Sequence, residues 1–162
     1  MTKHLRLFAS LTLVPILLSA PACSKKEDAT PHTVISVHYT AGGSAMQYLG
    51  RIDVGNIDHA DTHPGTYFSA LVTSPTLEGT REILTDPPAY LDDYDLTVKV
   101  YMRAAERGTT ATYPIPPGTF VQAEILVNGQ VRKTARVDET TQLGQYDLYP
   151  TQTVSVPFKG LK

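Results

Sequence analysis

The chain has 162 residues, with 14 Lys plus Arg against 16 Asp plus Glu, no Trp and a single cysteine. This length suits one domain with its own hydrophobic core. A mildly negative chain without a basic cluster argues against nucleic acid as a partner. A single cysteine excludes a disulfide within the chain.

The N-terminal segment predicts export. Lys3 and Arg6 precede a short apolar run, and Ala-Pro-Ala at 20–22 follows it, which is the three-part layout of a secretory signal peptide. The apolar run is too short for a settled transmembrane helix. We therefore expect residues 1–22 to be a signal peptide. Its removal lowers Lys plus Arg from 14 to 12 against 16 acidic residues, a formal charge of −4.

The only cysteine, Cys23, directly follows the expected cleavage site. The segment resembles a bacterial lipoprotein signal, in which this cysteine becomes the first mature residue and carries the lipid. Ala20 and Pro21 depart from that family's usual residues. The resemblance implies lipidation at Cys23 and a membrane reached through an N-terminal lipid anchor. The alternative is that an ordinary signal peptidase cuts the same bond and releases a secreted or periplasmic soluble protein.

Residues 23–32 form a short polar segment that predicts a flexible tether. Ser24 after the cysteine resembles lipoproteins passed on to an outer membrane. Lys-Glu-Asp at 26–28 resembles the tag of some surface-exposed Gram-negative lipoproteins, although such a charge run is also typical of a solvated tether. We therefore expect a lipid-anchored cell-envelope protein of the outer membrane, with the side of the membrane left open.

From residue 33 onward, apolar and polar residues alternate in short runs, which is typical of β-strands. The clearest run, 95–103, indicates one face on a core and one in water, as in an antiparallel sheet. No segment shows helical periodicity beyond a turn, and 85–93 is expected to be a loop with room for one helical turn. The expected strands are 33–39, 45–54, 66–73, 80–84, 95–103, 120–127, 131–137, 145–149 and 151–158.

Asn128-Gly129, between two alternating runs, predicts a β-hairpin. A two-residue loop would pair Val127 with Gln130, and apolar side chains would then face polar ones along the ladder. We therefore predict a bulge or a three-residue loop at 128–130, with Gly129 or Gln130 at positive φ. The expected pairs are Val127–Val131, Ala123–Ala135 and Val121–Val137.

Seven to nine short strands with turn signals between them predict an all-β protein, an antiparallel β-sandwich over residues 33–162. From Tyr94 to Val137 the chain has an alternating strand, a proline-rich connection and the run Ala-Glu-Ile-Leu-Val-Asn-Gly-Gln-Val. This segment resembles the C-terminal half of small envelope-anchored immunoglobulin-like domains, including the mycobacterial small transport-accessory membrane proteins. The resemblance implies an immunoglobulin-like sandwich and says little about activity.

One loop holds four residues of the types that bind metal ions. Imidazole and carboxylate suit zinc, and a metal-dependent hydrolase using this loop is the alternative function. Asp and His are also ordinary loop residues, so a solvated loop is the simpler interpretation, and no metal or other cofactor is expected. The candidate ligands are Asp58, His59, Asp61 and His63.

Nine tyrosines in a Trp-free chain suggest a binding surface, because tyrosine is favoured at interfaces. Tyr90, Tyr94 and Tyr113, near the proline-rich stretches, are the candidates for a peptide or carbohydrate platform. Half-buried sheet tyrosines are the commoner arrangement. No nucleophile elbow, P-loop or Cys-x-x-Cys is present, so no catalytic residue is expected. We predict a non-enzymatic envelope protein that binds a protein, peptide or glycan partner.

Overall fold

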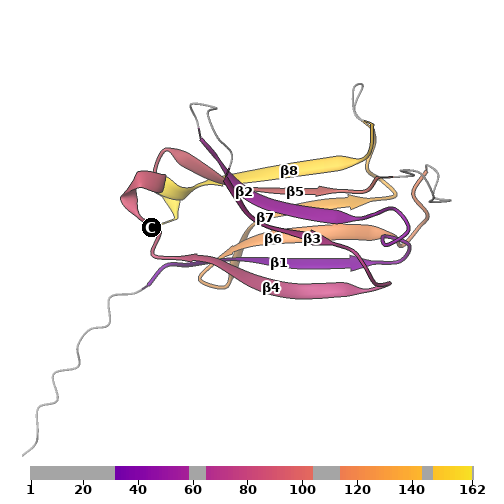
Figure 1. Ribbon diagram of the computed structural model, residues 1–162, viewed down its shortest axis with the longest axis horizontal. Helices are drawn as coiled ribbons and strands as arrows, with labels where there is room; N and C mark the ends of the chain where they lie inside the picture. The colour runs from indigo at the N-terminus through magenta and orange to yellow at the C-terminus, as the bar shows by residue number, and fades with distance from the viewer. Residues whose placement is uncertain (1–31, 59–64, 104–113, 144–147, 162) are drawn as a thin grey trace, which may run out of the picture. The chain divides into compact units, whose positions relative to one another are not determined.

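Two antiparallel four-stranded sheets form a β-sandwich in the computed structural model, which describes residues 32–58, 65–103, 114–143 and 148–161 (Figure 1). This confirms the predicted all-β fold. One sheet has the order β4-β1-β6-β7 and the other β3-β2-β5-β8. The strands are β1 (Val34–Gly42), β2 (Arg51–Asp58), β3 (Gly65–Leu71), β4 (Leu77–Thr85), β5 (Tyr94–Tyr101), β6 (Phe120–Val127), β7 (Gln130–Asp138) and β8 (Thr151–Pro157).

The strand order is immunoglobulin-like. β1 pairs with β4 and β2 pairs with β5, so the chain repeatedly crosses from one sheet to the other. In immunoglobulin terms, β1 and β4 take the positions of strands B and E, and β2, β5 and β8 take those of C, F and G. β3 lies beside β2 as a C′ strand does. The hairpin β6–β7 fills the side of β1 where strand A would lie.

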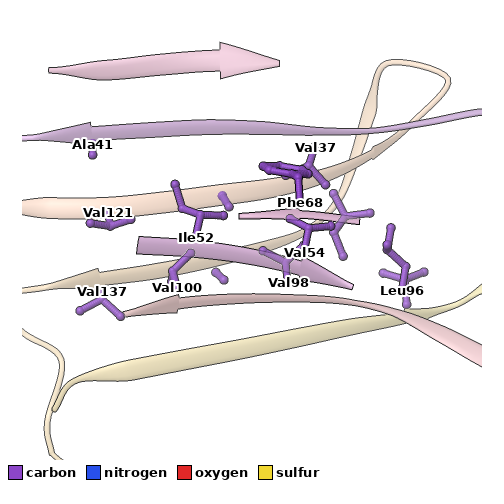
Figure 2. Packing of buried hydrophobic residues seen from close by; sticks show 14 of the residues in the cluster. Val37, Ala41, Ile52, Val54, Phe68, Leu96, Val98, Val100, Val121 and Val137 are labelled. Carbon is purple, nitrogen blue, oxygen red and sulfur yellow. The ribbon is translucent and has the colours of Figure 1, made fainter. Parts of the chain in front are cut away.

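The core lies between the two inner faces. On β5, Leu96, Val98 and Val100 are fully buried, as the alternation in this segment predicted. Figure 2 shows these side chains together with those of β2 and the facing sheet between the layers. Burying one such side chain contributes about 1.5–3 kcal/mol. The largest fully buried side chains are Phe158, Ile35, Ile52, Leu96, Met102, Ile125, Val37, Val54, Val72, Val98, Val100 and Val121.

The predicted strand 45–54 is wrong in its first half. β2 begins at Arg51, and residues 43–49 form turns closed by backbone bonds such as Tyr48 N to Ser44 O (3.3 Å). Of the two apolar residues that suggested a strand here, Tyr48 is buried beside Ala45 at the end of the core, whereas Met46 is 39% exposed. The turn is needed because the chain passes here from one sheet to the other, a separation of about 10 Å.

The predicted bulge in the β6–β7 hairpin is confirmed, but it lies within β7 and not in the loop. Val127 pairs with Gln130 across a two-residue turn, so the expected Val127–Val131 pair is wrong. Asn128 (φ 51°) and Gly129 (φ 76°) both have the positive φ that a type I′ turn requires. The register then shifts opposite Ile125 and Leu126. Beyond the shift, the expected pairs Ala123–Ala135 and Val121–Val137 are present.

Other segment boundaries differ modestly from expectation. The fourth strand extends from Leu77 to Thr85, and β2 continues to Asp58 into the stretch expected to be a loop. The expected helical turn is a 3-10 helix, η1 (Ala89–Leu91), and a second, η2 (Phe158–Gly160), ends the described chain. Among the described residues, no helix combines the length and apolar character needed to cross a bilayer.

Candidate binding face

The outer face of the β3-β2-β5-β8 sheet carries a cluster of polar side chains from three neighbouring strands. Arg51 and Asp53 flank the buried Ile52 on β2, so the strand period of two directs both outward. The register places Ser69 of β3 opposite Asp53 on one side and Lys99 of β5 opposite it on the other. The sheet therefore brings together residues that are far apart in the sequence.

The carboxylate of Asp53 lies at the centre of this cluster. Its Oδ1 accepts hydrogen bonds from Arg51 Nε at 2.8 Å and from Ser69 Oγ at 2.5 Å. Its Oδ2 accepts one from the Tyr101 hydroxyl at 3.0 Å. Arg51 Nη2 also donates to Ser69 Oγ at 3.2 Å. Donors from β2, β3 and β5 thus converge on one carboxylate and connect the three strands.

The electrostatics of the cluster follow from these bonds. Burial raises the pKa of Asp53, but the hydrogen bonds from its three donors outweigh burial and hold the pKa below its ordinary value. Burial and the bond to Asp53 raise the pKa of Tyr101 to about 12. The hydrogen bond to Asp53 raises the pKa of Arg51. At neutral pH the cluster therefore holds a carboxylate, a guanidinium and a neutral phenol.

Cations and a second aromatic ring cover Tyr101. The residue points outward as its place in the alternation predicted, yet it is only 5% exposed. Its ring centroid lies 5.3 Å from that of Tyr149, and Lys99 Nζ lies 5.5 Å above it. The Arg103 guanidinium lies 5.7 Å from the Tyr101 ring and 5.1 Å from that of Tyr149. The side chains of Lys99 and Arg103 are thus held against the two rings by cation–π contacts.

A depression of about 320 Å³ adjoins the cluster and is lined by residues of β2, β3 and β5. Gly55 and Gly65 line it, and the strands approach so closely there that a Cβ on Gly55 would lie 2.3 Å from the Gly65 carbonyl oxygen. Arg51, Ser69 and Lys99 supply polar groups to its wall. Small-molecule sites begin at about 300 Å³, so the depression suits a small polar group or a single side chain of a partner.

The geometry favours recognition over nucleophilic chemistry at this cluster. Ser69 Oγ donates to a carboxylate whose pKa is below its ordinary value, and such a carboxylate is a poor base for activating a hydroxyl. Within the described chain the histidines are engaged elsewhere: His32 bonds Asp86, and His38 Nδ1 lies 3.0 Å from Thr80 Oγ1. The cluster can hold a polar partner in a fixed geometry.

The residues singled out from the sequence lie apart from this cluster or outside the described residues. Asp58 ends β2 opposite Tyr94, whose side chain packs partly buried against the core. Tyr90 lies in η1 and is 74% exposed. Among the described residues, no group of three or more His, Cys, Asp or Glu could hold a metal ion. The candidates outside the described residues, which stay predictions, are Cys23, His59, Asp61, His63 and Tyr113.

Sequence reasoning missed Arg51, Asp53 and Ser69. One signal was available, because Arg51 and Asp53 are two residues apart in an expected strand, on the face opposite Ile52. Their convergence with Ser69 depends on the pairing register of β2 and β3, which includes a shift after Val54. Comparisons of the chain with protein-family models, with curated proteins and with solved structures found no match.

Proposed function

We propose that this chain is a non-enzymatic, lipid-anchored protein of the cell envelope, placed in the outer membrane, that binds a partner through its β-sandwich. Two kinds of support combine. The N-terminal sequence supports export and acylation, and the polar face centred on Asp53 supports a binding role for the folded part. The partner is a protein, peptide or glycan of the envelope.

The observation that carries the proposal is the position of Cys23. It is the only cysteine of the chain and directly follows Ala-Pro-Ala at 20–22. Lipid chains contribute about 0.8 kcal/mol per buried methylene, and stable anchoring needs more than one chain, as diacyl or triacyl cysteine supplies. The first strand begins at Val34, and the ten residues from 24 to 33 reach at most about 35 Å when extended. The sandwich would therefore stay close to the membrane surface.

The binding role is supported by the preorganisation of the outer face of β2, β3 and β5. The bonds to Asp53 already fix these side chains in the unbound protein, so little conformational entropy is lost when a partner binds. Lys99 lies over the ring of Tyr101 and brings a positive charge to this face. Such a face favours a polar or acidic partner.

Cell fractionation and intact-mass analysis test the anchor. We expect the wild-type protein in the membrane fraction, with a mass that begins at Cys23 and includes acyl chains. Cys23→Ala should leave uncleaved precursor or move the protein to the soluble fraction, because no thiol remains to be acylated. Ser24→Ala, at the neighbouring residue, is the matched control and should stay in the membrane fraction. An unmodified residue 23 in the mature wild type, or unchanged membrane association of Cys23→Ala, would refute the anchor.

A further inference from the structure

Among the described strands four lie at sheet edges, and three of them are protected against pairing with another chain. Natural sheets protect edges with charges, proline, bulges or a covering segment. β4 carries Arg81 between two glutamates, and β7 carries several basic residues and a bulge. β8 ends in Pro157 and lies against β7, where Gln152 Oε1 accepts the backbone N–H of Arg136 at 2.5 Å. The exception is the second half of β3, Phe68 to Leu71, which has no charge and no proline and lies beyond the bulge of this strand at Tyr67.

The backbone of β3 directs unshared hydrogen-bonding groups away from β2. Val72 N donates to Gly50 O at 2.8 Å, directly beyond the last pair of the β2–β3 ladder. This bond makes Val72 and Gly50 a hydrogen-bonded pair. Because bonded and non-bonded pairs alternate in an antiparallel ladder, Leu71 and Ser69, one and three residues before Val72, belong to non-bonded pairs. Each therefore points its N–H and C=O toward the open edge. The bond from Met102 N to Pro150 O, directly beyond the last pair of the β5–β8 ladder, leads to the same assignment. When the alternation is followed from this bond across β5 and β2, Leu71 again belongs to a non-bonded pair.

An arginine flanks this edge on each face of the sheet. On the outer face, Arg51 lies opposite Leu71 and its side chain is 43% exposed. On the inner side, the guanidinium of Arg81, from β4 of the other sheet, lies 5.0 Å from the centre of the Phe68 ring. Arg81 pairs with the buried Val37, so it points inward, whereas its neighbour Glu82 points to the opposite face.

We propose that the β3 edge is a docking site for an extended acidic segment of a partner protein, which adds as a strand beside β3. The proposal deepens the binding role proposed above and rests on it. Ser69 and Leu71 would supply the backbone hydrogen bonds of this strand addition. Adjacent residues of a strand point to opposite faces, so two neighbouring acidic residues would meet Arg51 and Arg81, one on each face.

Titration of the full-length protein, isolated in a mild detergent and labelled with ¹⁵N, tests the edge. The probe is a capped peptide, Val-Thr-Glu-Glu-Thr-Val, compared with Val-Thr-Lys-Lys-Thr-Val. We expect the Glu peptide to shift the amide signals of Ser69 and Leu71, and the Lys peptide to bind at least about fivefold more weakly because it loses exposed ion pairs. Shifts confined to another strand, no shifts, or equal binding of both peptides would overturn the proposal.

Variants separate the backbone contribution from the charge contribution. Leu71→Pro removes one outward N–H and should abolish binding, whereas Leu71→Ala keeps that N–H and should retain binding. Arg81→Glu should abolish the preference for the Glu peptide, because each peptide then meets one attractive charge and one repulsive charge, and Glu82→Arg, on the other face of β4, should leave the preference unchanged. Self-association of the wild type that Leu71→Pro abolishes would assign the edge to a second copy and overturn the peptide assignment. Unchanged membrane association of Cys23→Ala would refute the lipid anchor but not the docking site, because the peptide titration does not depend on acylation.

Discussion

Two strands of the sandwich carry the same three-residue pattern in different surroundings. Arg51-Ile52-Asp53 lies on β2, inside its sheet, and Arg136-Val137-Asp138 lies on β7, at the edge of the other sheet. In each, the arginine Nε donates to the aspartate two residues later, at 2.8 Å and 2.7 Å. The middle residue is buried in both. The strand period of two accounts for this shared geometry.

The two carboxylates differ in their remaining donors. Asp53 accepts from Ser69 on β3 and from Tyr101 on β5, so its bonds join three strands. Asp138 accepts from the backbone N–H of Thr140 at 2.9 Å and from its hydroxyl at 2.7 Å, so its bonds fix the turn that follows β7. The same local motif therefore has a tertiary role inside one sheet and a local role at the edge of the other.

Asp53→Ala should have the largest effect on the free energy of unfolding. It removes the acceptor of three donors and leaves the hydroxyl of the buried Tyr101 without its partner, and an unsatisfied buried group costs about 1–3 kcal/mol. We expect the free energy of unfolding, measured by urea denaturation of the full chain, to fall by about 3 kcal/mol. Asp138→Ala, the matched variant, should lower it by about 1 kcal/mol. Equal losses would show that the cross-strand bonds of Asp53 add nothing to the local pair.

Tyr101→Phe isolates one of these cross-strand bonds. The ring stays in place beside Tyr149, and only the hydroxyl that donates to Asp53 is lost, so we expect a loss of about 1 kcal/mol in unfolding free energy. Absorbance titration should show a tyrosine with a pKa of about 12 in the wild type that is absent from the variant. Tyr90→Phe, at an exposed residue, should change neither measurement. Persistence of that titration in Tyr101→Phe would assign it to another tyrosine.

The sequence predicted the fold well where burial on one face dictates the register. The alternation of 95–103 and of 120–127 corresponds to β5 and β6, whose inner residues are fully buried. Prediction failed at 45–50, because Tyr48, which is buried in a turn, has the same spacing from the exposed Met46 as two residues on one face of a strand. The bulge was misplaced for a related reason. Val131 is 52% exposed, so no buried face decided its pairing.

The binding face was much harder to predict than the fold. The local pair of Arg51 and Asp53 follows from strand periodicity alone. The contributions of Ser69 and Tyr101 depend on which strands become neighbours and in which register, and this is decided by packing of the whole sandwich. The open edge at β3 also appears only once the strand order is known, since the sequence does not show which strands lie at the edges.

Asp138→Asn should have the smallest effect on the free energy of unfolding, and the pH dependence of that effect identifies the charge of Asp138 as its source. The hydrogen bonds from Thr140 and Arg136 hold the pKa of Asp138 below its ordinary value, so the folded chain binds this proton less tightly than the unfolded chain. The contribution is therefore fully present above the unfolded pKa of about 3.9 and is lost as pH falls through the folded pKa. We expect the difference in unfolding free energy between wild type and Asp138→Asn, below about 1 kcal/mol at neutral pH, to shrink steadily with acidification.

Asp53→Asn completes the comparison in the same urea series from neutral to acidic pH. The pKa of Asp53 is also below its ordinary value, because its hydrogen bonds outweigh the effect of burial, so its contribution is lost in the same direction. A neutral amide cannot accept from all three donors as the carboxylate does, and Tyr101 stays buried, so the loss at neutral pH should exceed that of Asp138→Asn. A difference from wild type that is the same at every pH, for either variant, would contradict the assigned ion pair and leave only neutral hydrogen bonding at that site.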